Sequence, residues 1–403
     1  MLDQRINPQV FLRMTSLKDI IRYKLGRNKE EYLSSFKEAI DLINSKSHNF
    51  DDIFSYDIKG KTIFKVQTIA SLYYSRYINK TLKRLYKVKQ SNRDIITQQI
   101  NALLTETSPF YIIKGDVKDF YESINCDRVI RKLKEDKLLD LRHIAVIEQV
   151  LGNSKGSIGI PRGISFCSTL GELFVRKFDE EIRRMPGVYF YARYVDDFVI
   201  FTHDDEINIS HIEKELSKLG LCLNKNKTHK YSSALLYKNK QCITFLGYMH
   251  EIHSKNNVLI KISNKRIKKI KTRIILTYLD FFKNKDIELF ELRIQFLTGN
   301  YIINTTQDNK KNLLAGFYYN NSAINDHSQI SELDRFLMRI ATSNKGFIPS
   351  GLSSGTLAKL KSIPRKHYFA KGFHSRVVHE IDVEDFNKIK SCWDREYIYE
   401  KSK

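Results

Sequence analysis

Apolar residues recur at helical spacing along most of the chain. Between residues 29 and 45 they stand three or four positions apart, which predicts an amphipathic helix, and Thr15 or Ser16 is placed to cap a preceding helix that runs through residue 25. The same spacing predicts further helices over residues 67–86, 127–139, 140–151, 165–185, 209–219, 287–297 and 331–340.

Shorter runs rich in β-branched and aromatic residues interrupt this helical pattern. They predict a hairpin over 56–66 that turns at Gly60, strands at 111–117 and 221–223, a hairpin over 191–201, and a pair formed by 241–250 and 258–262. Helices mixed with antiparallel hairpins indicate an α+β fold.

The hairpin over 191–201 contains an unusual turn. Asp196 and Asp197 stand between two apolar runs, so we expect both carboxylates at the tip. A two-residue turn favours Gly or Asn, and neighbouring carboxylates repel each other unless a cation lies between them. A bare Asp-Asp pair is more often a solvated turn than a site. A third acid, Asp116, ends the strand over 111–117, and only adjacent strands of one sheet would bring it to the pair.

Composition narrows the class of protein. The 403 residues include 68 Lys and Arg against 46 Asp and Glu, and the net charge of +22 points to a large anionic partner, usually nucleic acid. The five cysteines form no CxxC pair, so we expect neither a zinc site nor disulfides, and expect reduced, buried thiols. Residues 1–26 contain no continuous apolar run, so we expect a cytoplasmic protein without a signal peptide or membrane contact.

Two basic segments could meet phosphates, although a merely solvated face is as good a reading of either. The first consists of Lys83, Arg84, Lys87, Lys89 and Arg93. The second, Lys265, Arg266, Lys268 and Lys269, alternates with a stripe of Ile267, Ile270 and Ile274, so one helix face would pack while the other stays basic.

Five motifs in order resemble motifs A to E of reverse transcriptases. They are the strand ending in Asp116, Gly159-Ile160-Pro161-Arg162-Gly163, Tyr194-Val195-Asp196-Asp197, Leu223-Asn224-Lys225-Asn226-Lys227-Thr228 and Phe245-Leu246-Gly247-Tyr248. Within that family the chain resembles bacterial defence-associated and abortive-infection reverse transcriptases, through residues 85–93, 119–124 and 163–170. Residues 296–301 resemble one subunit of the type 3 two-polymerase systems.

The resemblance implies a right-hand polymerase with fingers, a ferredoxin-like antiparallel palm and a helical thumb. An N-terminal helical region would cover residues 1–66, fingers and palm 67–262, and thumb and C-terminal region 263–403. It implies an RNA-directed, untemplated or protein-primed DNA polymerase of antiviral (phage) defence in the bacterial cytoplasm. Its partners would be dNTPs and nucleic acid, as non-coding RNA or DNA product, and a second polymerase subunit or a homo-oligomer.

The resemblance also assigns roles to residues. Asp116, Asp196, Asp197 and the Val117 carbonyl would hold two Mg²⁺ ions, with Mn²⁺ as a substitute, and Lys227 would protonate the leaving pyrophosphate. Arg84, Arg93, Arg162 and Gly163 would contact the nucleotide, and Tyr121 would form a wall against the ribose 2′-hydroxyl. The segment Phe245, Leu246, Gly247 and Tyr248 would position the primer, and Lys83, Lys87, Lys89 and the second basic segment would bind nucleic acid.

Arg162 departs from the family pattern, since many members have Gln between the corresponding Pro and Gly, near the template base. Arg adds a charge and planar hydrogen-bond donors at this position, so the pattern supports polymerase activity more firmly than it supports copying of a bound template. Two alternatives remain: a catalytically idle palm that serves as a non-coding-RNA-binding scaffold, and an RNA-dependent RNA polymerase.

Overall fold

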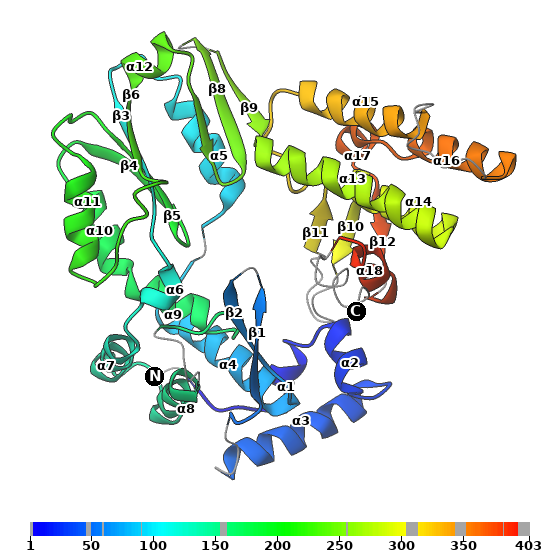
Figure 1. Ribbon diagram of the computed structural model, residues 1–403. Helices are drawn as coiled ribbons and strands as arrows, with labels where there is room; N and C mark the ends of the chain where they lie inside the picture. Colours follow the sequence, from blue (N-terminus) through cyan, green and yellow to red (C-terminus); the bar gives the residue numbers. More distant parts are fainter. Residues whose placement is uncertain are drawn as a thin grey trace. The chain divides into compact units, whose positions relative to one another are not determined.

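The computed structural model of the chain describes residues 3–45, 50–58, 60–89, 91–153, 159–254, 257–303, 313–342, 352–381 and 383–393. The chain divides into two compact units (Figure 1). Unit 1 comprises Met1–Ile96, Ser108–Leu236 and Thr306–Asn309, and unit 2 comprises Thr97–Thr107, Tyr237–Thr305 and Lys310–Lys403. The fold is of the predicted α+β class. The three predicted domain limits stay a prediction.

Unit 1 begins with short helices and a hairpin. Ser16 caps α2 in a capping box with Asp19, and Arg76 from α4 holds the Asp19 carboxylate with bonds of 2.6 and 3.0 Å. The elements are α1 (Pro8–Leu12), α2 (Leu17–Tyr23), α3 (Lys29–Asn44), β1 (Ile53–Ile58), β2 (Lys61–Val66), α4 (Ile69–Leu85) and α5 (Arg93–Leu103), which continues into unit 2. Of these, α2, α3, α4 and the β1–β2 hairpin confirm predicted elements, with ends shifted by at most three residues.

The centre of unit 1 is a four-stranded antiparallel sheet in the order β4-β5-β3-β6. Its strands are β3 (Tyr111–Asp116), β4 (Val188–Tyr194), β5 (Asp197–Thr202) and β6 (His229–Ser232), of which β6 was not predicted. Gly115 lets the Phe198 ring lie against the β3 backbone, because a side chain at that position would collide with the ring. The sheet therefore packs tightly just beside Asp116.

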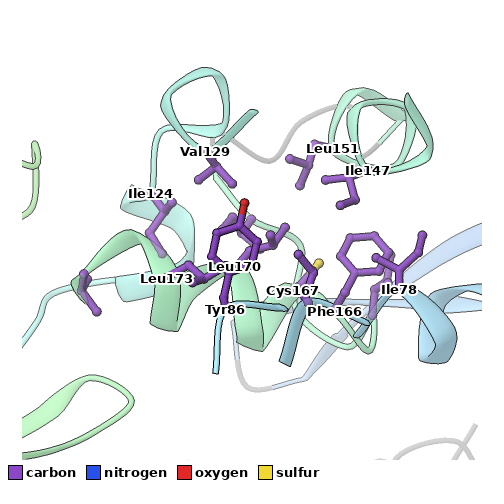
Figure 2. Close-up of a cluster of buried hydrophobic side chains, with 14 of the residues drawn as sticks. Ile78, Tyr86, Ile124, Val129, Ile147, Leu151, Phe166, Cys167, Leu170 and Leu173 are labelled. Atoms are coloured by element: carbon purple, nitrogen blue, oxygen red, sulfur yellow. The ribbon is translucent and has the colours of Figure 1, made fainter. Parts of the chain in front are cut away.

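Helices cover this sheet and the rest of unit 1. They are α6 (Phe120–Ser123), α7 (Cys126–Asp136), α8 (Leu141–Asn153), α9 (Cys167–Phe174), α10 (Arg176–Arg184), α11 (Ile209–Ser217) and α12 (Ser233–Lys238). Figure 2 shows part of the core, where Phe166, Cys167, Leu170 and Leu173 of the α9 region meet side chains of other helices. Ile124, Val129, Ile147 and Leu151 of α7, α8 and the residues before them belong to the same core (Figure 2).

One predicted helix was wrong. Residues 165–185 form two helices, α9 and α10, separated at Val175, and Phe166 rather than Ser165 precedes the first. Ser165 instead accepts a hydrogen bond from Ser75 of α4 at 3.4 Å. The break allows α9 and α10 to pack different faces, since Leu170 and Leu173 of α9 and Phe178 and Ile182 of α10 are all buried.

Unit 2 has two small sheets and a helical layer. Its elements are β7 (Cys242–Phe245), β8 (Tyr248–Ser254), β9 (Asn257–Ile262), α13 (Asn264–Asn284), α14 (Ile287–Thr298), β10 (Asn300–Ile303), β11 (Leu313–Gly316), α15 (Ser328–Thr342), α16 (Ser354–Lys366), α17 (Phe369–His374), β12 (Val378–Glu380) and α18 (Val383–Lys390). The predicted strand 241–250 was wrong because it folds back at Leu246 and Gly247, both with positive φ, to give the order β7-β8-β9. A separate apolar cluster forms the core of this unit.

The structure also bears on the expectations for the cysteines and for membrane-spanning helices. Of the five cysteines, Cys222 and Cys242 are exposed, which contradicts the expectation that all are buried. Among the described residues, no helix combines the length and the hydropathy that crossing a membrane requires.

Candidate active site

The three acids of the sequence analysis come from facing strands of the central sheet. Asp116, the last residue of β3, is the register partner of Asp197, the first residue of β5. Tyr194 pairs with Asp197 across the hairpin, so the turn consists of Val195 and Asp196. The expectation that both carboxylates lie at the tip is therefore wrong for Asp197, which is a strand residue. This register places Asp197 directly beside Asp116.

The hairpin turn is tied to the end of β3. The Val117 N–H donates to the Asp196 carbonyl at 2.9 Å. Val195 has a φ of 59°, an uncommon conformation for a β-branched residue that costs about 1–3 kcal/mol. The surrounding contacts hold the turn in this conformation.

A buried arginine also holds this turn, through the Val195 carbonyl. Arg193, whose side chain is 5% exposed, donates through Nη1 to the Val195 carbonyl at 2.8 Å. Its remaining donors bind the carboxylates of Glu172 on α9 and Asp179 on α10, at 2.7–3.2 Å. Sequence reasoning missed this network, because one Arg in a strand gives no sign of two acids that come from preceding helices.

The carboxylates repel one another electrostatically. Burial, together with the charges of Asp196 and Asp116, raises the pKa of Asp197 to about 6. Two lysines offset part of this: the Lys227 ammonium lies 2.9 Å from Asp116 Oδ2, and the Lys114 charge favours ionised Asp197. Lys114 is a residue of β3 that sequence reasoning missed.

The donor set has the chemistry of a divalent-cation site. Carboxylate oxygens are the ligands that Mg²⁺ prefers, and a cation would relieve the repulsion that raises the pKa of Asp197. Within the described ranges, no three His, Cys, Asp or Glu side chains already converge on one point as metal ligands do. An ion at Asp116 would compete with the Lys227 ammonium for that carboxylate.

The segment that carries Lys227 is fixed by main-chain bonds. Lys118 N–H donates to the Cys222 carbonyl at 2.9 Å, and Asn224 N–H donates to the Asp116 carbonyl at 2.8 Å. The strand predicted at 221–223 is thus reduced to a single bridge between Val117 and Leu223. These bonds bring Lys227 to Asp116, 111 residues away in the sequence.

Tyr121 and Arg162 lie together beside this site. Phe120 and Tyr121 begin the short helix α6, with Phe120 buried in the core and Tyr121 half-buried. The Arg162 guanidinium lies 4.7 Å from the centre of the Tyr121 ring, and Glu122 holds it with two bonds of 2.7 and 2.9 Å. The Glu122 partner was not foreseen.

The loop with Arg162 is joined to the hairpin β1–β2. Phe64 N–H donates to the Arg162 carbonyl at 2.7 Å. Gly163 has a φ of +104°, and a side chain there would collide with the Phe64 carbonyl, so only Gly fits this position. The glycine-rich run that contains this loop begins at Gly156, and residues 156–158 of it lie outside the described residues.

The first basic segment makes its contacts elsewhere. Arg84 is exposed and donates to the Asp3 carbonyl at 3.1 Å, and Arg93 forms an ion pair with Asp94 at 3.1 Å. Lys87 and Lys89 are exposed and Lys83 is half-buried at the end of α4. Their assignment to nucleotide or nucleic acid stays a prediction.

The remaining candidates belong to unit 2. Phe245 and Tyr248 are buried, so of the four residues only Leu246 and Gly247, which form the β7–β8 turn, are partly exposed. On α13, Lys265, Lys268 and Lys269 are exposed while Ile267 and Ile274 are buried, as the stripe predicted. Arg266 is half-buried, with its guanidinium bound to the Gly247 and Asn320 carbonyls at 3.4 and 2.9 Å.

Solved structures similar to this chain include telomerases and a viral polymerase. The chain is 16% identical to apo telomerase of Candida tropicalis truncated from the C-terminal domain (TM-score 0.39), with 58% of this chain and 60% of that one covered. Telomerase of Candida albicans in complex with a fragment of telomeric RNA has 16% identity (TM-score 0.35; 81% and 54% covered). The RNA-dependent RNA polymerase of a human picorbirnavirus also has 16% identity (TM-score 0.32; 49% and 40% covered).

In each case the match covers less than two thirds of the solved chain. No curated protein matches the sequence. Residues 62–250, which include every residue of the carboxylate site, match the family described as reverse transcriptase (RNA-dependent DNA polymerase). The chain therefore contains a reverse transcriptase domain.

Proposed function

We propose that this chain is a DNA polymerase that transfers deoxynucleotides to a growing 3′ end at Asp116, Asp196 and Asp197. The observation that carries the proposal is the pairing of Asp116 with Asp197 across β3 and β5, with Asp196 in the adjoining turn. When bound, two divalent ions would activate the attacking hydroxyl and stabilise the charge on the leaving pyrophosphate.

In this proposal the protein supplies the position and charge of the ligands. Asp116 and Asp197 are fixed by the sheet register, and Arg193 and the Val117 N–H fix the turn that carries Asp196. The Val117 carbonyl would complete the nucleotide-side site. Lys227 is protonated near neutral pH, as any ordinary lysine is, and the hydrogen bond to Asp116 raises its pKa further, so it carries a proton that pyrophosphate could accept.

Tyr121 and Arg162 would line the nucleotide pocket. A rigid ring at Tyr121 would exclude the ribose 2′-hydroxyl, and the bidentate Glu122–Arg162 pair supports that ring. Because two of the Arg162 nitrogens are occupied by Glu122, the side chain is less available to a template base than its sequence position suggests. We therefore leave RNA-directed, untemplated and protein-primed synthesis as outcomes for experiment.

The resemblance to defence-associated reverse transcriptases supports a role in bacterial antiviral defence, in the cytoplasm and with a non-coding RNA or a second polymerase subunit as partner. If this is correct, expression of the chain with its genomic neighbours should lower phage plating, and loss of the acids should restore it. Equal phage plating on cells with the wild-type and the mutant chain would reject the defence role, and the polymerase assignment would still stand.

The decisive experiment is incorporation of labelled dNTPs by purified protein with Mg²⁺. We expect Asp196→Ala with Asp197→Ala to abolish incorporation, since the site then lacks two of its three acids while the main-chain bonds of the hairpin remain. Thermal unfolding and RNA binding should change little.

The chain offers a matched control in a second Asp-Asp pair. Asp204 and Asp205 follow β5, and Asp205 forms an ion pair with Lys230 at 3.1 Å. Asp204→Ala with Asp205→Ala should leave incorporation near the wild-type rate. Synthesis retained by the first double variant, or lost equally in both, would reject the proposed site.

A further inference from the structure

A cavity in unit 2 takes no part in the site described above. It has a volume of about 550 Å³, within the range of small-ligand sites, and lies between α14, the end of α16, α17 and β12. Two histidines, His367 and His379, line it with their ring centres 6.4 Å apart. The side chains that hold these two rings determine what the cavity can bind.

Each histidine is fixed through one ring nitrogen. His367 Nε2 lies 3.1 Å from Glu291 Oε1, and a carboxylate can only accept, so Nε2 carries the proton. The Gln295 amide nitrogen lies 2.8 Å from His379 Nδ1, which must accept, so the proton of that ring is on Nε2. Burial lowers the pKa of both imidazoles, which favours their neutral forms.

The other nitrogen of each ring has no hydrogen-bond partner among the described residues. The cavity therefore offers one acceptor, His367 Nδ1, and one donor, the His379 Nε2–H. Gly299 keeps this donor accessible, because a side chain there would stand 3.3 Å from His379 Nε2. A donor beside an acceptor complements the hydrogen-bonding edge of a nucleobase.

The charge and shape of the lining favour a flat, neutral ligand over a free anion. Lys366 and Lys371 are balanced by Glu288 and Glu291, two positive against two negative charges. Tyr368, 37% exposed, adds an aromatic face on which a base could stack. Arg365, Lys366 and Lys371 are exposed around it and could meet the phosphates on either side.

We propose that this cavity binds one unpaired base of a single strand of nucleic acid. The inference rests on the proposed function only in supplying nucleic acid as the ligand class. The base would be bound by residues of unit 2, whereas Asp116 and Asp197 belong to unit 1, and it would come from a template, a partner RNA or a single-stranded product. RNA and DNA present the same chemistry here, so the experiment must separate them.

The test measures binding of fluorescein-labelled single strands of 12 nucleotides to the full-length chain by fluorescence anisotropy. The probes are RNA, DNA and an abasic DNA strand of equal length and charge, without dNTPs and in the Asp196→Ala, Asp197→Ala background. His367→Phe with His379→Phe keeps ring volume but removes the donor and acceptor. We expect Kd for the RNA or DNA strand to rise about tenfold, the effect of two ordinary hydrogen bonds, and Kd for the abasic strand to stay unchanged.

Two controls accompany this variant. His374→Phe changes an exposed histidine at the end of α17 that does not line the cavity, and should bind every strand as the background does. Val377→Trp fills the cavity from a position 36% exposed, so it tests the site even if the histidine variant unfolds. Its Kd for strands with bases should rise likewise.

Equal weakening on the abasic strand, or no change in either cavity variant, would overturn the inference. Because binding is measured without catalysis, a chain that fails to polymerise can still pass this test. A chain that polymerises can equally fail it.

Discussion

At the scale of single residues, the site brings three carboxylates together and places two lysine ammonium groups near them. Ionised Asp197 is disfavoured by burial and by two neighbouring acids, and Lys114 and Lys227 compensate only in part. The positive charge of Arg162 is likewise paired, since the Glu122 carboxylate neutralises it beside the Tyr121 ring. These pairings leave the Tyr121 ring with a defined position, which makes its role testable.

The first residue-scale prediction concerns Tyr121. If its ring excludes the ribose 2′-hydroxyl by volume, Tyr121→Ala should raise the kcat/KM for rNTPs relative to dNTPs by about tenfold to a hundredfold. Tyr121→Phe should keep the wild-type ratio because the ring remains. Equal ratios in wild type and a folded, active Tyr121→Ala would reject the wall and favour the RNA polymerase alternative.

The second residue-scale prediction concerns His250 of β8. This residue is fully buried, neither ring nitrogen has a hydrogen-bond partner in the described structure, and burial lowers the pKa to about 4. Between pH 6.5 and 4 the unfolded chain therefore binds a proton that the folded chain does not, so stability is lost as pH falls through this window.

His250→Leu removes that linkage. The stability of the variant relative to wild type, from denaturant unfolding, should grow by about 3 kcal/mol between pH 7 and pH 4, since each pKa unit corresponds to about 1.4 kcal/mol. Met249→Leu, a change at the neighbouring position of the same strand that involves no titrating group, is the control and should give a flat difference. A flat curve for His250→Leu would mean that the ring is protonated or paired in the folded chain.

At the scale of elements, apolar spacing in the sequence predicted those helices and strands whose formation depends on neighbouring residues. The helices with clear apolar spacing, such as α3 and α4, and the strands β3, β4 and β5 were predicted within a few residues. The break at Val175 was missed because apolar spacing continues through it, and tertiary packing alone separates α9 from α10. The turn at Leu246 and Gly247 was not predicted as the end of a strand.

The candidate site shows the same division. The sequence could indicate Asp116, Asp196 and Asp197 through their order along the chain, and adjacent strands do join them. It could not indicate Arg193, Glu172 and Asp179 as one network, since pairing of these charges depends on how α9 and α10 meet β4. Side-chain partners distant in sequence leave no periodic signal.

An element-scale prediction concerns the basic face of α13. Reversing charge at Lys265, Lys268 and Lys269, all exposed, should weaken nucleic-acid binding and flatten its salt dependence. The slope of log K against log salt should fall by up to about 3 if all three contact phosphates, because each contact contributes about 0.9 for B-form DNA. Arg266 is left unchanged, since its guanidinium holds the β7–β8 turn.

The matched control reverses Lys283 and Lys285, which are exposed at the other end of the same helix. The slope should then stay near the wild-type value. An unchanged slope in the triple variant would mean that this face of α13 is only solvated.

At the scale of the whole molecule, each unit has its own apolar core. Buried residues from Phe11 to Leu223 form the first cluster, and those from Tyr248 to Trp393 form the second. The strands that carry Asp116 and Asp197 contribute Ile113, Phe198 and Ile200 to the first cluster. Damage confined to the second core should therefore leave their geometry unchanged.

Arg293 of α14 allows this to be tested. It is 2% exposed, and its guanidinium binds the Asp280 carboxylate, the carbonyls of Lys388 and Ile389, and Ser391 Oγ. It thus joins α13 and α14 to the end of α18. Arg293→Ala would leave a carboxylate and two carbonyls without this partner, a loss of about 3–5 kcal/mol for a buried ion pair.

The expected result is a local loss of stability, read by hydrogen exchange across the chain. Amides of α13, α14 and α18 should exchange faster in Arg293→Ala, whereas amides of β3, β4 and β5 should keep their wild-type protection. Arg335→Ala is a matched control on α15, because this exposed arginine donates to the Ser331 carbonyl at 3.4 Å, a weak contact, and its loss should leave exchange near the wild-type rate. Faster exchange throughout both units in Arg293→Ala would show that the two cores unfold together, and the site at Asp116 and Asp197 would then depend on the C-terminal helices as well.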